Sequence, residues 1–126
     1  MNALVDTSVF VGVERRGVSL DGLEHAGVSA VTIGELGLGV EMASEAKKRS
    51  LRAATLAVAE NRFDVVGFDQ ATATECSRLM GDARRRGRRP SVQGTIIAAT
   101  AVHNCVPLIT QDVGFLAFPE LDVILV

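Results

Sequence analysis

Three acidic residues in this sequence have the spacing and surroundings to do chemistry together: Asp6, Glu35 and Asp112. Carboxylates that are brought together repel one another and resist joint ionisation unless a cation joins them. No lysine stands near any of the three in the chain. The set therefore favours a hard divalent cation such as Mg²⁺, which prefers oxygen ligands. Thr7 and Ser8 follow the first acid directly, and we expect them to orient a carboxylate from behind.

Helix capping is the simpler explanation for each acid taken alone. Asp6 and the two hydroxyl residues after it are all residue types that favour the N-cap of a helix. Thr32 and Glu35 match the Thr-x-x-Glu capping box. For any single acid the cap is the better interpretation, whereas the three acids together favour a metal site.

The apolar pattern predicts strands that alternate with helices, and this alternation predicts an α/β fold with a mainly parallel central sheet flanked by helices. The expected strands are residues 2–5, 28–31, 63–68, 106–110 and 121–126. The expected helices are residues 7–15, 32–43, 45–60, 69 to about 86, and 91 to about 104. Binding sites in such sheets form beyond the carboxyl ends of the strands. Asp6 and Asp112 follow strands, and Glu35 lies one helical turn past another, so all three acids fall at this edge.

Length and composition are consistent with one domain. The chain has 126 residues, almost half of them hydrophobic, and a formal net charge of −2. Its two cysteines, Cys76 and Cys105, support neither a zinc site nor a disulfide scaffold. The sequence shows no secretory signal pattern and no apolar run long enough to span a bilayer. We therefore expect a soluble cytoplasmic protein that does not bind membranes.

Four segments, in order, resemble the successive motifs of PIN-domain proteins: "LVDTSVFV", "SAVTIGELGLGV", "IIAATAVHN" and "LITQDVGFL". The VapC-like toxins of bacterial type II toxin–antitoxin pairs are the most similar group. The resemblance implies a single PIN-like ribonuclease domain over residues 1–126 and an endoribonuclease that depends on Mg²⁺ or Mn²⁺. It also implies a structured RNA substrate, often transfer or ribosomal RNA, a cognate antitoxin that silences the enzyme, and a homodimer.

By position in these motifs, Asp6 corresponds to the first acid of the family, Glu35 to the second, and Asp112 to the acid near the last part of the site. Two positions depart from the pattern. Gly114 stands where many relatives carry a further acid, and Gly94 stands where the family has an aspartate that is usually a direct metal ligand.

Gly94 is also unfavourable by local rules. If Ser91 is the N-cap, glycine occupies the third helical position, where an acid would complete a capping box and favour the helix dipole. Glycine inside a helix costs roughly 0.5–1 kcal/mol relative to alanine. Three explanations remain open. The protein is a weakened or inactive relative, or an acid was replaced to disarm it, or a neighbour such as Gln93, Ser91 or Thr95 holds the metal through water.

A basic stretch, "DARRRGRRP", precedes the expected helix that carries Gly94. Arginine forks fit phosphate groups, so the stretch is a candidate for binding RNA or the antitoxin. The candidate residues are Arg84, Arg85, Arg86, Arg88 and Arg89. A solvated helix end, whose dipole also favours cations, explains the run equally well. The stretch holds no aromatic residue, so base stacking is not expected there.

Two other classes of protein compete with a nuclease. A phospho-acceptor receiver domain also gathers acids at strand ends, but it would need an acidic pair after the first strand and a lysine after a late one, and "LVDTS" and "LITQD" contain neither. A catalytically silent RNA- or antitoxin-binding PIN-like protein is the stronger alternative, because of Gly94.

Overall fold

The computed structural model describes all 126 residues, and a parallel sheet of five strands runs through its centre. The strands are β1 (Leu4–Val5), β2 (Gly27–Ser29), β3 (Asp64–Val66), β4 (Leu108–Thr110) and β5 (Val123–Leu125). Their order across the sheet is β3-β2-β1-β4-β5, and every neighbouring pair is parallel. The carboxyl ends of all five strands therefore lie along one edge, and β1 occupies the middle of the sheet.

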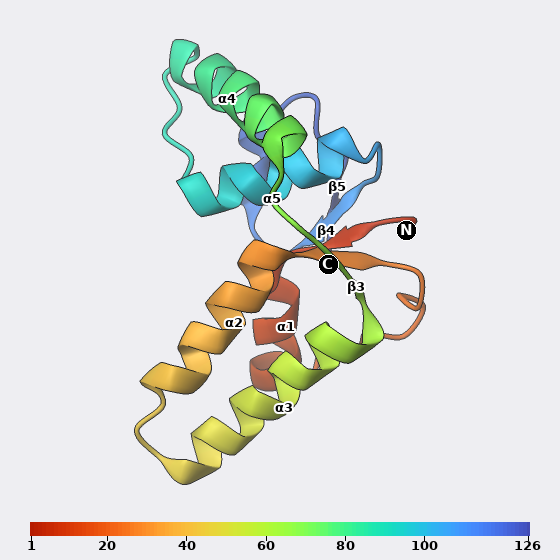
Figure 1. Cartoon of the computed structure of the whole chain (residues 1–126), viewed down its shortest axis with the longest axis vertical. Helices are drawn as coiled ribbons and strands as arrows, with labels where there is room; N and C mark the ends of the chain where they lie inside the picture. The colour runs from red at the N-terminus through yellow and green to blue at the C-terminus, as the bar shows by residue number, and fades with distance from the viewer.

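Helices cover both faces of the sheet, as the sequence predicts. They are α1 (Thr7–Arg16), α2 (Ala30–Met42), α3 (Ala46–Arg62), α4 (Gln70–Arg85) and α5 (Val92–His103), with a short 3₁₀-helix, η1 (Val113–Ala117). Figure 1 shows α1, α2 and α3 on one side of the sheet and α4 and α5 on the other. No helix combines the length and apolar character needed to cross a membrane. The predicted α/β class is confirmed, while η1 was not predicted.

Two separate apolar cores result from the alternation of side chains along the strands. Leu4 and Leu108 point into the core under α4 and α5. Their neighbours Val5 and Ile109 belong to the core under α1, α2 and α3. Successive strand residues face opposite sides of a sheet, so a short apolar strand serves both layers.

The helix starts explain one difference from the sequence-based boundaries. Asp69 and Ser91 cap α4 and α5, as expected. The cap of α2 is Ser29, whose side chain accepts a hydrogen bond from the Val31 amide, so the helix begins at Ala30. Thr32 is therefore already inside the helix. The capping-box explanation of Glu35 is wrong, because its proposed partner is not the N-cap.

Leu108→Ala tests the importance of the central strands. Leu108 is fully buried in β4, and truncating a buried leucine removes apolar contacts and leaves a cavity. We expect the free energy of unfolding to fall by about 2–5 kcal/mol in urea titrations. Ile124→Ala on the edge strand β5 is the control, since Ile124 is 44% exposed and its truncation should cost much less. Equal losses in the two variants would contradict this account of the core.

Candidate functional site

A cleft of about 630 Å³ opens at the carboxyl-terminal edge of the sheet, and it collects all three acids that the sequence singled out. Its lining is mostly polar. The lining residues are Asp6, Thr7, Ser8, Val11, Arg16, Glu35, Ser91, Gln93, Gly94, Ile97 and Asp112. Segments far apart in the sequence therefore build one surface from the length of α1, the first turns of α5, the second turn of α2 and the loop after β4.

Strand register brings the first and last acids to neighbouring strands. β1 lies beside β4, and Val5 is paired with Ile109. Asp6 follows β1 directly and caps α1, and its amide donates to the carbonyl of Ile109 at 2.9 Å. Asp112 follows β4 and caps η1. Both acids therefore act as helix caps and also face the cleft, so the two interpretations of the sequence are compatible.

Two hydroxyl groups of the protein hold the Asp6 carboxylate in place. Its Oδ2 atom accepts from Ser8 Oγ at 2.6 Å and from Thr110 Oγ1 at 2.8 Å. A hydroxyl has one proton, so the 3.2 Å contact between these two oxygens is not also a hydrogen bond when both donate to Asp6. The hydroxyls accept in turn from backbone amides, Ser8 from Gln111 at 2.9 Å and Thr110 from Asp112 at 3.0 Å. The loop after β4 thereby fixes the rotamer of Asp6.

The other oxygen of Asp6 is available to a ligand. The residue is only 5% exposed, and Oδ1 accepts no hydrogen bond from the protein. No buried side-chain oxygen in the structure lacks a hydrogen-bond partner, so Oδ1 must reach the solvent of the cleft. Asp6 thus presents one oxygen to the cleft while its other oxygen is fully engaged by the protein.

Glu35 is exposed on α2 and is linked to α1 through Thr7. The single hydroxyl proton of Thr7 has two acceptors at 2.9 Å, Glu35 Oε1 and Thr32 Oγ1. Thr7 can therefore donate to the Glu35 carboxylate and hold it in place, or donate to Thr32 and leave the carboxylate free to move. This gives Glu35 more freedom than Asp6 has.

Asp112 is exposed, and its Oδ1 atom accepts from the Gly114 amide at 2.8 Å. A Cβ atom at Gly114 would lie 3.0 Å from the same oxygen. The glycine therefore lets the backbone approach the Asp112 carboxylate, at the position where the family pattern has a further acid. Oδ2 of Asp112 accepts no hydrogen bond and is open to a ligand.

The three acids line one cleft, but their side chains do not form a preassembled metal cluster. No group of three or more His, Cys, Asp or Glu side chains in the structure has the geometry to hold one ion. The donors are nevertheless all carboxylate oxygens, the type that Mg²⁺ and Mn²⁺ prefer, and each acid has an oxygen without a protein partner. Binding a shared cation would require Glu35 and Asp112, the two exposed acids, to turn toward Asp6.

Gly94 occupies the third position of α5, and its amide donates to the capping Ser91 Oγ at 2.9 Å. A Cβ atom at this position would also lie 2.9 Å from Ser91 Oγ, which is the end of a side chain that can rotate. Its next nearest neighbours are ring carbons of Phe115 at 3.9 Å. The cleft therefore has room for a side chain at residue 94 if the serine shifts.

Two residues of the site were not predicted. Thr110 anchors Asp6, and the only clue to it in the sequence is a polar residue at the end of a buried strand. Arg16 is the only lysine or arginine in the cleft lining, and it donates to Gln111 Oε1. Gln111 packs so closely on α1 that a Cβ at Gly12 would lie 2.8 Å from its side-chain oxygen. In the sequence, Arg16 is distinguished only as part of the basic last turn of a helix.

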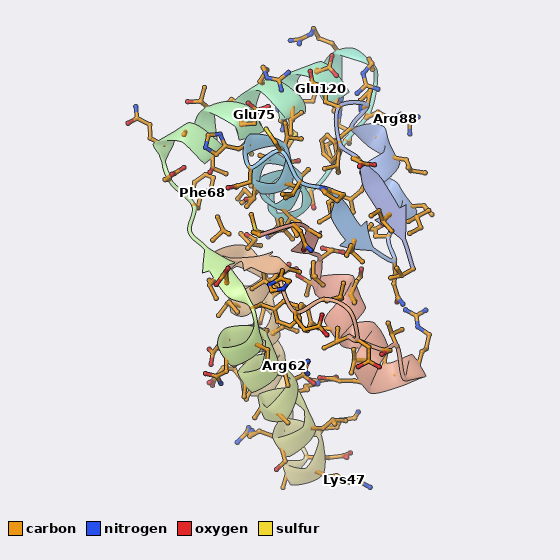
Figure 2. All side chains as sticks on the ribbon, turned by 90° about the vertical axis from the view of Figure 1, so that its right-hand side faces the viewer. Lys47, Arg62, Phe68, Glu75, Arg88 and Glu120 are labelled. Carbon is orange, nitrogen blue, oxygen red and sulfur yellow. The ribbon has the colours of Figure 1, made fainter.

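None of the five arginines between residues 84 and 89 lines the cleft. Arg86 has a structural contact, because it donates to the Ala117 carbonyl at 2.7 Å and pairs with Asp82 at 3.0 Å. Arg88, labelled in Figure 2, is exposed on the loop that leads from α4 to the start of α5. The arginine run is therefore joined to the cleft along the chain through Pro90 and Ser91, of which only Ser91 lines the cleft.

Known proteins share both the sequence pattern and this architecture. The PIN domain model matches residues 3–121. The chain belongs to the PIN domain family. Ribonuclease VapC4 of Mycobacterium tuberculosis is 39% identical over 125 residues, which is 97% of this chain and 95% of that protein. Ribonuclease VapC8 of the same species is 43% identical over 100 residues, which is 78% of this chain and 88% of the relative.

A solved structure of the same family has the same architecture. The crystal structure of VapBC-5 from Mycobacterium tuberculosis, a member of the VapBC family of toxin–antitoxin systems, superposes with a TM-score of 0.84 at 31% identity. The superposition covers all of both chains. The five-stranded sheet and its helices are thus the PIN arrangement.

Thr110→Val tests the anchoring of Asp6. Valine keeps the volume of the fully buried threonine but removes the hydroxyl that donates to Asp6 and accepts from the Asp112 amide. Because partners of a lost buried group remain unsatisfied, we expect the free energy of unfolding to fall by about 1–3 kcal/mol. The measurement is chemical denaturation against Thr74→Val, whose hydroxyl bonds only its own exposed helix. A Thr110→Val variant as stable as that control would contradict the anchoring role.

Proposed function

We propose that this chain, as one PIN domain, is the toxin component of a type II toxin–antitoxin pair and an endoribonuclease that hydrolyses RNA phosphodiester bonds with a divalent metal. The observation that carries the proposal is the cleft in which Asp6, Glu35 and Asp112 each present an unpartnered carboxylate oxygen. The relatives named as VapC ribonucleases, which match most of the chain, support the same activity.

Asp6 and Asp112 would hold Mg²⁺ or Mn²⁺ through oxygens that the fold leaves open. Such an ion lowers the pKa of a water, orients it and neutralises charge on the phosphate. Glu35 would complete the set of ligands or accept a proton from the attacking water, since Thr7 can release its carboxylate. If the bond from phosphorus to the 3′-oxygen breaks, as the family resemblance implies, attack by water would leave a 5′-phosphate on one product and a 3′-hydroxyl on the other. Three acids and a glycine support one ion more readily than two.

The solved relatives support one of the proposed partners, the antitoxin. A structure described as VapBC-5, in which both toxin and antitoxin are named, supports a cognate antitoxin for this chain. We further propose a homodimer and a transfer or ribosomal RNA substrate. Arg84, Arg85, Arg88 and Arg89 are exposed and form no ion pair, which suits a contact with RNA or antitoxin.

A silent RNA- or antitoxin-binding protein is the second candidate, and Gly94 is the observation that favours it. With no acid at the start of α5, the three carboxylates must bind the ion without a fourth. The absence of a preassembled cluster is consistent with weak metal binding. The two candidates differ in one property, which is whether RNA is cleaved.

Cleavage of labelled RNA with Mn²⁺ or Mg²⁺ separates the two. We expect metal-dependent cleavage by the chain with this sequence and its loss in Asp6→Ala, because that variant removes the one buried carboxylate of the cleft. A chelator should abolish the activity of the unsubstituted chain, and circular dichroism checks that the variant is folded. Identical background cleavage in both proteins would support the silent alternative.

Gly94→Asp tests whether the missing acid limits the site. The added carboxylate would enter the cleft at the first turn of α5, where the helix dipole also favours a negative charge. We expect tighter Mn²⁺ binding by calorimetry and faster RNA cleavage. Gly94→Asn is the matched control, since it displaces Ser91 Oγ equally but adds no charge. Unchanged affinity and turnover in the aspartate variant would count against a metal site at this position.

A further inference from the structure

The carboxylate cleft continues into a groove that none of the sequence motifs revealed. Thr7, Val11 and Glu35 line both the cleft and a neighbouring hollow of about 200 Å³. That hollow shares Glu14, Arg15 and Arg52 with a third one of about 190 Å³, which reaches Lys48. The three hollows are therefore neighbours, and their lining follows α1 and α2 from the acids to the start of α3. We call the part beyond Glu35 the α1–α3 groove, which is lined by Glu14, Arg15, Gly39, Lys48, Leu51 and Arg52.

The cations of this groove are free to bind an anion. The ion pairs of the structure involve only Arg78 and Arg86, so Arg15, Lys48 and Arg52 have no acidic partner. Arg52 is held in place, because its Nη1 donates to the Gly39 carbonyl at 2.8 Å. Its other guanidinium donors make no hydrogen bond to the protein, and the residue lines both hollows. A guanidinium fixed in this way loses little conformational freedom when it binds phosphate.

The acids of the cleft make such cations necessary for an RNA substrate. Asp6, Glu35 and Asp112 repel a phosphate group, and Arg16 is the only cation in the cleft itself. The α1–α3 groove adds three cations and one further acid, Glu14, so it offsets part of that repulsion just outside the cleft. Phosphate contacts dominate the affinity of proteins for nucleic acids.

We propose that the α1–α3 groove binds the RNA backbone on one side of the scissile bond, with Arg15, Lys48 and Arg52 as positioning residues for its phosphates. The proposal rests on the ribonuclease function proposed above and extends its substrate-binding surface. The groove lining contains no aromatic residue, so its contribution is independent of base identity. RNA is favoured over an acidic peptide because the groove leads directly to the carboxylates where a phosphodiester would be cut.

The experiment compares two double variants that each remove two positive charges. Arg15→Gln with Lys48→Gln changes the groove at two exposed residues. Lys47→Gln with Arg62→Gln is the control, since both residues are exposed, lie at opposite ends of α3 and do not line the groove (Figure 2). Binding of a fluorescent oligouridylate is measured in chelator, without divalent metal, between about 50 and 200 mM salt.

We expect the groove variant to bind more weakly. Its plot of log affinity against log salt should flatten by about 0.7 for each RNA phosphate that the variant no longer neutralises. The control should match the natural chain. With Mn²⁺ present, the groove variant should raise KM for RNA and leave kcat unchanged, because the cut phosphate still meets the same carboxylates.

Two results would overturn the proposal: equal loss of affinity in both variants, or unchanged RNA affinity in the groove variant. If the unchanged RNA affinity is accompanied by weaker binding of the cognate antitoxin, the groove is an antitoxin surface. The nuclease proposal fails separately. If the unsubstituted chain binds the oligouridylate through this groove but cleaves no RNA with Mn²⁺ or Mg²⁺, the RNA-binding surface stands and catalysis does not.

Discussion

The rest of the site depends on the hydrogen bonds that fix the Asp6 carboxylate at the centre of the sheet. Its Oδ2 atom is held by Ser8 from α1 and by Thr110 from β4, so two adjacent strands must be in register for the acid to be positioned. Burying a charged group is costly unless hydrogen bonds compensate it. Here both hydroxyls donate to one oxygen, and the other oxygen is left for a ligand. Fold and site are therefore coupled through one side chain.

The remaining acids are arranged with decreasing restraint around this fixed point. Asp112 is held by the short 3₁₀-helix that it caps, and Glu35 is steadied only by the shared proton of Thr7. One rigid acid next to two adaptable ones is consistent with a site whose carboxylates come together when a cation binds. It is not a site that holds them together permanently. Such an arrangement also limits carboxylate repulsion when no cation is bound.

The fold class and several helix starts could be predicted from the sequence, because they depend on local patterns. Alternating apolar runs predict the α/β class, and Asp69 and Ser91 cap the helices expected after them. The sequence alone could not assign Glu35 to the site, because Thr32 and Glu35 match a capping box. Only the start of α2 at Ala30 removes that explanation. Thr110 and Arg16 depend on which strands and helices become neighbours. The α1–α3 groove likewise joins residues of three helices, and no local pattern encodes such an arrangement.

We propose that Asp6, Glu35 and Asp112 share one divalent cation. A crystal structure with Mn²⁺, located by its anomalous scattering, tests it most directly. We expect a single strong peak in the cleft, at about 2.0–2.2 Å from Asp6 Oδ1, with Glu35 and Asp112 turned toward it as direct or water-mediated ligands. A cleft without a peak at saturating Mn²⁺, or a peak that contacts none of the three carboxylates, would contradict it.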